Sequence, residues 1–196
     1  MNIVGISQRV DVFSERNETR DALDQRLIAF VERCGGTPVP IPNKFQEDNG
    51  IALWLSNLKP SAIILSGGNN IGDCADRDKT ERYLLDNAFK YCLPVLGICR
   101  GMQMMGVWAG AEVRAVSSHT GVRHKLKGEL AHSVNSYHRF SLAAAPNGFS
   151  VIAKSEDDEI EAIRHESLPW EGWMWHPERE SHFSDHDITR FRALIK

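Results

Sequence analysis

No C-x-x-C pair occurs among the four cysteines, which are Cys34, Cys74, Cys92 and Cys99. Zinc ribbons are built from such pairs, and a disulfide framework from four cysteines would be sparse for 196 residues, so the sequence favours neither. Free cysteine is among the most frequently buried residue types, so Cys34, Cys74 and Cys92 are predicted to lie in the core.

A basic excess and a long apolar run are also lacking. The formal net charge is -3 and the Lys and Arg residues are scattered, which makes nucleic acid a poor partner. No apolar run approaches the ~20 residues of a membrane span, so no membrane partner is expected. Residues 1–6 lack a basic segment followed by a long apolar one. They are predicted to form the first core strand, and the cytoplasm is the expected location.

The composition favours one domain over residues 1–196, because 42% of the residues are hydrophobic and 25% are charged. Apolar segments alternate with amphipathic helical ones up to Gly110, and short alternating segments follow. This order indicates an α/β fold with an open, mostly parallel sheet flanked by helices, additional antiparallel strands and a final central strand. Helices are predicted at 19–33, 51–58, 80–91, 102–109 and 188–195. Strands are predicted at 3–7, 38–42, 62–65, 94–98, 113–116, 132–135, 140–142, 151–153, 160–165 and 172–175.

The segment Gly97-Ile98-Cys99-Arg100-Gly101 stands between a predicted strand and a predicted helix. This is the context of a nucleophile elbow, with cysteine in the place that serine takes in G-x-S-x-G. The glycines permit a sharp turn, and the N-terminus of the following helix favours the thiolate, which is the attacking form. The alternative is a buried core cysteine. The glycine pattern and the context favour a catalytic nucleophile.

A thiol nucleophile needs a base and a third group that orients the base. His176 follows an aromatic strand, and Pro177 holds it extended, so Glu178 is predicted to meet its imidazole because residues i and i+2 of an extended chain share a side. A strand-ending turn with two surface side chains is the alternative, which the cysteine elbow makes the weaker one. Five other histidines are predicted to be solvated, and the i,i+4 pair His182 and His186 lacks a third metal ligand. We therefore expect no metal and no cofactor. These five are His119, His132, His165, His182 and His186.

Three ordered motifs together resemble the class I glutamine amidotransferases, and within them the stand-alone γ-glutamyl hydrolases of peptidase family C26. The motifs are Gly97-Ile98-Cys99-Arg100-Gly101-Met102-Gln103, Val134-Asn135-Ser136-Tyr137-His138 and Trp175-His176-Pro177-Glu178. The resemblance covers nearly the whole chain and implies a flavodoxin-like sheet. Arg139-Phe140 departs from the His-Gln of many members, which implies a pocket other than that of a γ-glutamyl-γ-aminobutyrate hydrolase.

The resemblance implies a catalytic triad of Cys99, His176 and Glu178 that cleaves a γ-glutamyl amide through a γ-glutamyl thioester. Backbone N–H groups of Gly67, Gly68 and Arg100 would form the oxyanion hole. The glutamyl group would bind at Gln103 and at the segment Asn135, Ser136, Tyr137 and His138. An ordinary loop for the glycines and a solvated helix position for Gln103 stay open as alternatives.

Within the family, Ile6-Ser7-Gln8-Arg9 and Ser66-Gly67-Gly68-Asn69-Asn70 are similar to the γ-glutamyl-CDP-amidate hydrolases of phosphoramidate capsule biosynthesis. Arg9 follows the first strand, and a guanidinium there suits a pyrophosphate because it makes two parallel charged hydrogen bonds. Arg123, His124 and Lys125 form a second cationic cluster that suits the same group. Solvated loop charges are the alternative reading of both.

Two other functions share these motifs. A glutaminase subunit would pass ammonia to a synthase partner and would need a docking surface for it. A non-catalytic regulator would be expected to lack one member of the triad, whereas Cys99, His176 and Glu178 are all present. A small-molecule γ-glutamyl substrate, which is nucleotide-linked in the narrower resemblance, is therefore the favoured partner.

Overall fold

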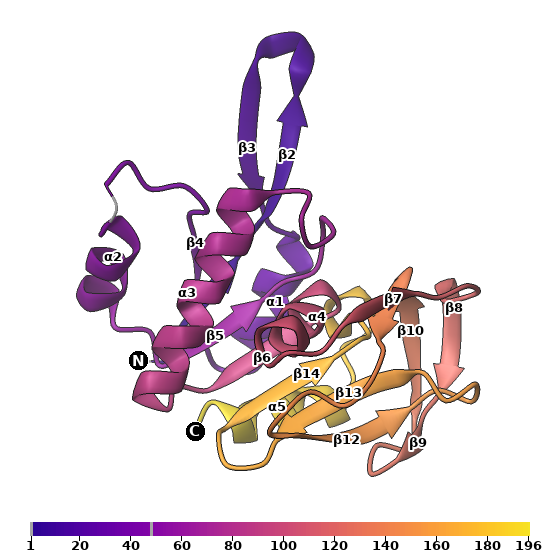
Figure 1. Cartoon of the computed structure of the whole chain (residues 1–196). Helices are drawn as coiled ribbons and strands as arrows, with labels where there is room; N and C mark the ends of the chain where they lie inside the picture. The colour runs from indigo at the N-terminus through magenta and orange to yellow at the C-terminus, as the bar shows by residue number, and fades with distance from the viewer. Residues whose placement is uncertain (1, 48) are drawn as a thin grey trace.

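The central element of the computed structural model, which describes residues 2–47 and 49–196, is an eight-stranded sheet. Its strand order is β4-β1-β5-β6-β14-β13-β12-β9, and the strands from β4 to β14 run parallel (Figure 1). These five are β1 (Ile3–Ser7), β4 (Thr37–Ile41), β5 (Ala62–Leu65), β6 (Val95–Ile98) and β14 (Trp170–Trp173). The predicted α/β class, with a last strand that lies centrally, is confirmed.

Helices cover both faces of this sheet, which explains why β5, β6 and β14 are buried along their whole length. α3 and α4 lie on one face and α1 and α5 on the other (Figure 1). Phe30 of α1 stacks on Phe191 of α5 with ring centroids 5.9 Å apart. The helices are α1 (Gln25–Arg33), α2 (Gly50–Leu58), α3 (Ala75–Tyr91), α4 (Arg100–Trp108) and α5 (Asp185–Leu194).

The second half of the chain is antiparallel. β12 (Phe149–Lys154) pairs with both β13 (Ile160–His165) and β9 (Lys127–Gly128), and so extends the main sheet. Two small two-stranded sheets lie at this end of the molecule (Figure 1). They pair β8 (Thr120–Lys125) with β10 (Ser133–Tyr137), and β7 (Val113–Ala115) with β11 (Phe140–Leu142).

A hairpin projects at the top of the molecule in Figure 1 and consists of β2 (Arg9–Phe13) and β3 (Glu18–Ala22). The helix predicted at 19–33 is therefore wrong in its first part, because the observed helix α1 begins only at Gln25. Residues 18–22 pair with β2, and Asp24 caps the helix by accepting a hydrogen bond from the Arg26 amide at 2.9 Å. The assignment of residues 1–196 to one domain stays a prediction. No helix of the described ranges combines the length and the apolar character that a membrane crossing needs.

Candidate active site

The turn between β6 and α4 holds Cys99 in an uncommon backbone conformation, with φ 51° and ψ -107°. Positive φ costs a non-glycine residue roughly 1–3 kcal/mol, and such residues cluster at functional sites. The Cys99 amide donates a 2.7 Å hydrogen bond to the carbonyl of Trp173 at the end of β14, which anchors the turn to the neighbouring strand. The thiol is therefore held at the carboxyl edge of the sheet, where open α/β sheets place their ligands.

The glycines that flank this turn are required by close packing. A Cβ at Gly101 would lie 2.0 Å from the carbonyl oxygen of Leu65 in β5, and one at Gly97 would lie 2.5 Å from Sδ of Met105. Neither position has room for a side chain, because α4 starts directly against β5. The predicted elbow geometry thus has a steric basis in this chain.

His176 and Glu178 lie just beyond β14. His176 is extended, with φ -109° and ψ 93°, as Pro177 predicted. Its Nδ1 lies 2.6 Å from Oε1 of Glu178, and both side chains are buried. The predicted route to this contact is wrong, because Glu178 belongs to a 3-10 turn (Pro177–Arg179) and not to an extended segment. Proline is favoured at the first position of a helical turn, where no amide hydrogen is needed.

The electrostatics of His176 favour its charged form. Burial lowers the pKa of this imidazole, but hydrogen bonding and charge interactions with Cys99 and Glu178 outweigh burial and raise it to about 9. Cys99 is thus near enough to influence the pKa of the His176 ring, although 77 positions separate the two residues in the sequence. The side chains of Cys99, His176 and Glu178 therefore lie near one another at this edge of the sheet.

Two side chains from distant elements fix the backbone of the His176 segment. The side-chain amide of Asn135 in β10 accepts from the His176 amide at 2.9 Å and donates to the His176 carbonyl at 2.8 Å. Arg26 of α1 donates to the carbonyl of Glu178 at 2.7 Å and also to that of Glu180. Asn135, which the resemblance assigned to substrate binding, therefore positions the histidine through its side chain.

The Ser66-Gly67-Gly68 turn after β5 passes beside the imidazole. A Cβ at Gly67 would lie 2.7 Å from Cε1 of His176, so a larger residue there would displace the ring. The buried guanidinium of Arg77 holds this turn by donating to the carbonyls of Ser66 at 2.7 Å and of Gly67 at 2.9 Å. Arg77 thus fixes the backbone of the turn that contains Gly67 and Gly68, the two glycines predicted for the oxyanion hole.

A buried ionic network supports both turns, and it was missed from the sequence. Glu81 of α3 pairs with Arg77 at 3.0 Å and with the side chain of Arg100, which also pairs with Asp78. Ser7 donates to Glu81 at 2.8 Å. The i,i+4 spacing of Arg77 and Glu81 was a visible signal, but such pairs are common on exposed helix faces. The Arg100 side chain points into this network, so its predicted role rests on its backbone amide.

A pocket of ≈240 Å³ opens beside His176. Arg9 lines it, as the resemblance implies, and pairs with Asp11 of the same strand at 2.5 Å. Arg179 also lines the pocket and stacks over the ring of Tyr137 at 4.8 Å. Arg179 was missed from the sequence. The lining residues are Arg9, Asp11, Ala22, Leu23, Asp24, Leu27, Ser66, Gly67, Gly68, His176, Glu178 and Arg179.

The second predicted cationic cluster does not form. Strand alternation in β8 sends His124 to the face opposite Arg123 and Lys125. Arg123 is bound to both carboxylate oxygens of Glu180 at 3.0 Å, and His124 faces Glu161 instead. A pyrophosphate would have to displace Glu180 from Arg123, so the pocket at Arg9 is the better candidate.

Four further predicted binding residues occupy different places. Tyr137 is exposed, and its ring centroid lies 6.0 Å from that of His176. Ser136 is buried and donates to the carbonyl of His119 at 2.6 Å. Gln103 is buried, not solvated, and donates to the carbonyl of Phe140 at 3.0 Å. His138 is buried in a separate cluster of histidines.

Several predictions about exposure are corrected. His119 is 1% exposed and not solvated, because His138 and Glu161 pack around it. Cys92 is exposed, not buried, since it ends α3 in a left-handed conformation with φ 52°. Cys34 is buried as predicted, Cys74 is half-buried, and all four cysteines are free thiols.

Comparison with known proteins decides the family. The sequence profile of class-I glutamine amidotransferases matches residues 20–195. The chain belongs to this family. The γ-glutamyl-CDP-amidate hydrolase of Campylobacter jejuni is 27% identical over 98% of this chain and 98% of its own length. A glutamine-hydrolysing GMP synthase subunit of Pyrococcus abyssi is 31% identical over 70% of this chain and 77% of its own length.

Solved structures support the amidotransferase fold. A protein described as a GMP synthase subunit, from Thermoplasma acidophilum, superposes with a TM-score of 0.76 at 19% identity, covering 100% of this chain and 92% of that one. A glutamine amidotransferase from Thermotoga maritima gives a TM-score of 0.65 at 16% identity, covering 97% of this chain and 80% of that one. Family membership supports an amide-hydrolysing enzyme.

Proposed function

We propose that this amidotransferase hydrolyses a γ-glutamyl amide with Cys99 as nucleophile, His176 as acid and base, and Glu178 as the group that orients His176. The observation that carries the proposal is the buried contact of 2.6 Å between His176 and Glu178 beside the Cys99 turn. These roles require that three side chains from two chain segments lie close together. The contact of His176 with Glu178 and the influence of Cys99 on the pKa of His176 support this.

In the proposed reaction, Sγ of Cys99 attacks the γ-carbonyl carbon, and the carbonyl oxygen becomes an oxyanion near the amides of Gly67, Gly68 and Arg100. His176 gives its proton to the leaving nitrogen, the C–N bond breaks, and a γ-glutamyl thioester remains on Cys99. A water then loses a proton to His176 and attacks the thioester. Glutamate leaves, and the proton on His176 restores the starting pair of thiolate and imidazolium.

The finer proposal is that the leaving group is a cytidine diphosphate amidate. It is supported by the full-length similarity to the Campylobacter jejuni hydrolase and by Arg9 and Arg179, two arginines that line the pocket beside His176. Guanidinium groups bind phosphate oxygens through paired charged hydrogen bonds. A nucleotide-linked substrate would then reach the nucleophile across the base of the β2–β3 hairpin.

The test compares substrates on the purified full chain. γ-Glutamyl-CDP-amidate should be hydrolysed with a much larger kcat/KM than glutamine or other plain γ-glutamyl amides, and equal values would remove the case for a nucleotide pocket. Arg9→Gln should lower kcat/KM for the nucleotide substrate ~10–100-fold, the loss expected for a charged hydrogen bond, and leave that for glutamine unchanged. Arg16→Gln, at the exposed tip of the same hairpin, is the matched control.

A second function is favoured by the similarity to GMP synthase subunits. In that case the chain would release ammonia for a synthase partner. Such subunits are often nearly inactive alone, so strong hydrolysis by the isolated chain would argue against it. Weak glutamine hydrolysis that rises when a synthase is added would support it. In either case Cys99→Ala should abolish turnover, and full activity of that variant would refute the proposed chemistry.

A further inference from the structure

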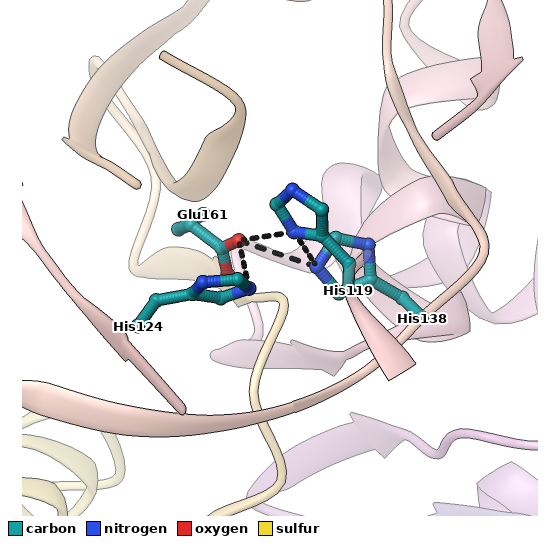
Figure 2. A group of neighbouring side chains, drawn as sticks. All are labelled: His119, His124, His138 and Glu161. Carbon is teal, nitrogen blue, oxygen red and sulfur yellow. Dashed lines mark hydrogen bonds and ion pairs between the residues drawn. The ribbon is translucent and has the colours of Figure 1, made fainter. Parts of the chain in front are cut away.

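A cluster of three histidines and one carboxylate lies in the antiparallel half of the molecule, apart from the Cys99 site. His119 precedes β8, His124 belongs to β8, His138 lies between β10 and β11, and Glu161 belongs to β13 (Figure 2). One ligating atom of each of the four residues lies within 4.8 Å of the corresponding atom of every other. Three of the side chains are buried and His124 is half-buried.

The hydrogen-bond partners outside the cluster fix the tautomers of two of these rings. Nε2 of His119 lies 2.9 Å from the carboxylate of Asp157, and Nδ1 of His138 lies 3.0 Å from the carbonyl of Phe140. Both partners are acceptors, so these two ring nitrogens carry the hydrogens. In the neutral rings, Nδ1 of His119 and Nε2 of His138 therefore point lone pairs into the cluster.

Inside the cluster, three hydrogen-bond acceptors then face one another: Nδ1 of His119, Nε2 of His138 and Oε1 of Glu161. Nδ1 of His119 and Nε2 of His138 are 3.2 Å apart, and they lie 3.5 Å and 3.2 Å from Oε1 of Glu161 (Figure 2). Three lone pairs at these distances repel one another unless a positive charge lies between them. In the part of the chain that the structure describes, Nε2 of His124 and Oε2 of Glu161 are buried atoms without a hydrogen-bond partner.

The distances match those of a tetrahedral metal site. Ligands placed about 2.0–2.1 Å from a zinc ion at tetrahedral angles lie about 3.3 Å apart, close to the three short distances in the cluster. His124 lies farther out, with Nε2 3.9 Å from Oε1 of Glu161, and would complete the site by a small rotation of its ring. Imidazole and carboxylate ligands suit zinc, and a protein ligand at all four positions leaves no open place for water.

We propose that His119, His124, His138 and Glu161 bind one zinc ion in a closed, structural site. The carboxylate of Asp157 and the carbonyl of Phe140 orient two of the ligands, as outer partners of metal-bound histidines commonly do. The site joins β8 and the end of β10 to β13. Bound zinc therefore stabilises the end of the fold that carries Asn135, which holds the backbone of His176.

The test uses the full chain freed of metal with a chelator and then titrated with cobalt(II) chloride. The expected result is visible absorption of four-coordinate cobalt that saturates at one equivalent and disappears when zinc chloride displaces it. Zinc should also raise the melting temperature of the metal-free protein. These readouts do not depend on turnover, so they separate the zinc site from the proposed hydrolase activity.

Variants locate the site. Glu161→Gln should lose the cobalt signal, because it removes a proposed ligand. The exposed carboxylate of Asp157 is not a ligand but orients His119, so Asp157→Asn should weaken cobalt binding ~10–100-fold. His182→Ala, an exposed histidine elsewhere, should bind cobalt as wild type does. The proposal is overturned if the wild-type protein binds no stoichiometric cobalt, which would mean that a proton on one imidazole neutralises the cluster. It is also overturned if Asp157→Asn and Glu161→Gln, folded by circular dichroism, retain wild-type affinity.

Discussion

Replacing Glu178 by glutamine should move the titration of His176 to lower pH. The pKa of His176 rises from 6.5 to about 9, which at about 1.4 kcal/mol per pKa unit favours the imidazolium by about 3 kcal/mol. Burial opposes this rise, and Cys99 and Glu178 cause it. Glutamine keeps the size of the side chain but removes the charge, so the pKa should fall toward 6.5.

The imidazolium is the form that protonates the leaving nitrogen in the proposed reaction. Wild-type kcat/KM for glutamate release should therefore fall above about pH 9, and in Glu178→Gln this alkaline limb should lie at lower pH. Removing the orienting charge should also lower kcat/KM ~10²-fold at neutral pH, and His176→Ala should lower it further because the acid and base itself is lost.

The same shift has a stability consequence with a defined sign. Because folding raises the pKa of His176, the stabilisation is fully present below pH 6.5 and is lost as the pH rises through about 9. Urea denaturation at several pH values should show a smaller loss across this window in Glu178→Gln than in wild type.

A proton NMR titration of the histidine resonances gives the pKa without any substrate, and the His176 signal is identified by its absence in His176→Ala. Glu180→Gln is the matched control, because Glu180 contacts Arg123 and Asn135 but lies outside the interactions that set the pKa of His176. An unchanged His176 pKa in Glu178→Gln would refute the argument that this carboxylate stabilises the imidazolium.

Three other perturbations have expected outcomes. Gly101→Ala should lower the free energy of unfolding by ~1–3 kcal/mol or more in urea denaturation, because the added Cβ would lie 2.0 Å from the Leu65 carbonyl; wild-type stability would show that the turn relaxes freely. Asp187→Asn should gain stability relative to wild type as the pH rises from about 4 to about 7. Burial raises the pKa of Asp187 from 3.8 to about 7, so the wild type loses stability across that window, by up to about 4 kcal/mol, and equal pH slopes in denaturation would contradict this. In mass-spectrometric mapping after iodoacetamide treatment at pH 8, Cys92 should be alkylated and Cys34 spared, because burial raises the pKa of Cys34 to about 12; modification of Cys34 at the same rate would exclude that environment.

The features that the sequence predicts well depend on residues that are close together in the chain. The turn at Cys99 follows from two glycines between an apolar strand and a helix, and the contact of Glu178 with His176 spans two residues. The family then follows from the order of the motifs. Even here the local geometry differs, since a 3-10 turn replaces the extended segment expected at Glu178.

The features that the sequence does not predict arise from pairing across the fold. Residues 19–22 carry a helical pattern but form β3, because β2 offers a complete antiparallel partner. Likewise, the histidine cluster draws on residues before β8, within β8, after β10 and within β13, with no spacing that marks a metal site. The burial of His119 depends on residues after β10 and within β13 that are distant in sequence, so the sequence alone indicated a solvated side chain.

The central place of β14 in the sheet has a consequence for the order of folding. This strand is made after most of the chain, yet it separates β6 from β13. While a growing chain lacks residues 170–173, β6 keeps an unpaired edge, and such apolar edges are sites of aggregation. The hydrogen bond from the Cys99 amide to the Trp173 carbonyl can also form only at this step. A nascent chain would thus need protection of β6 until its C-terminal segment emerges, and the proposed nucleophile Cys99 and base His176 would come together in the same event.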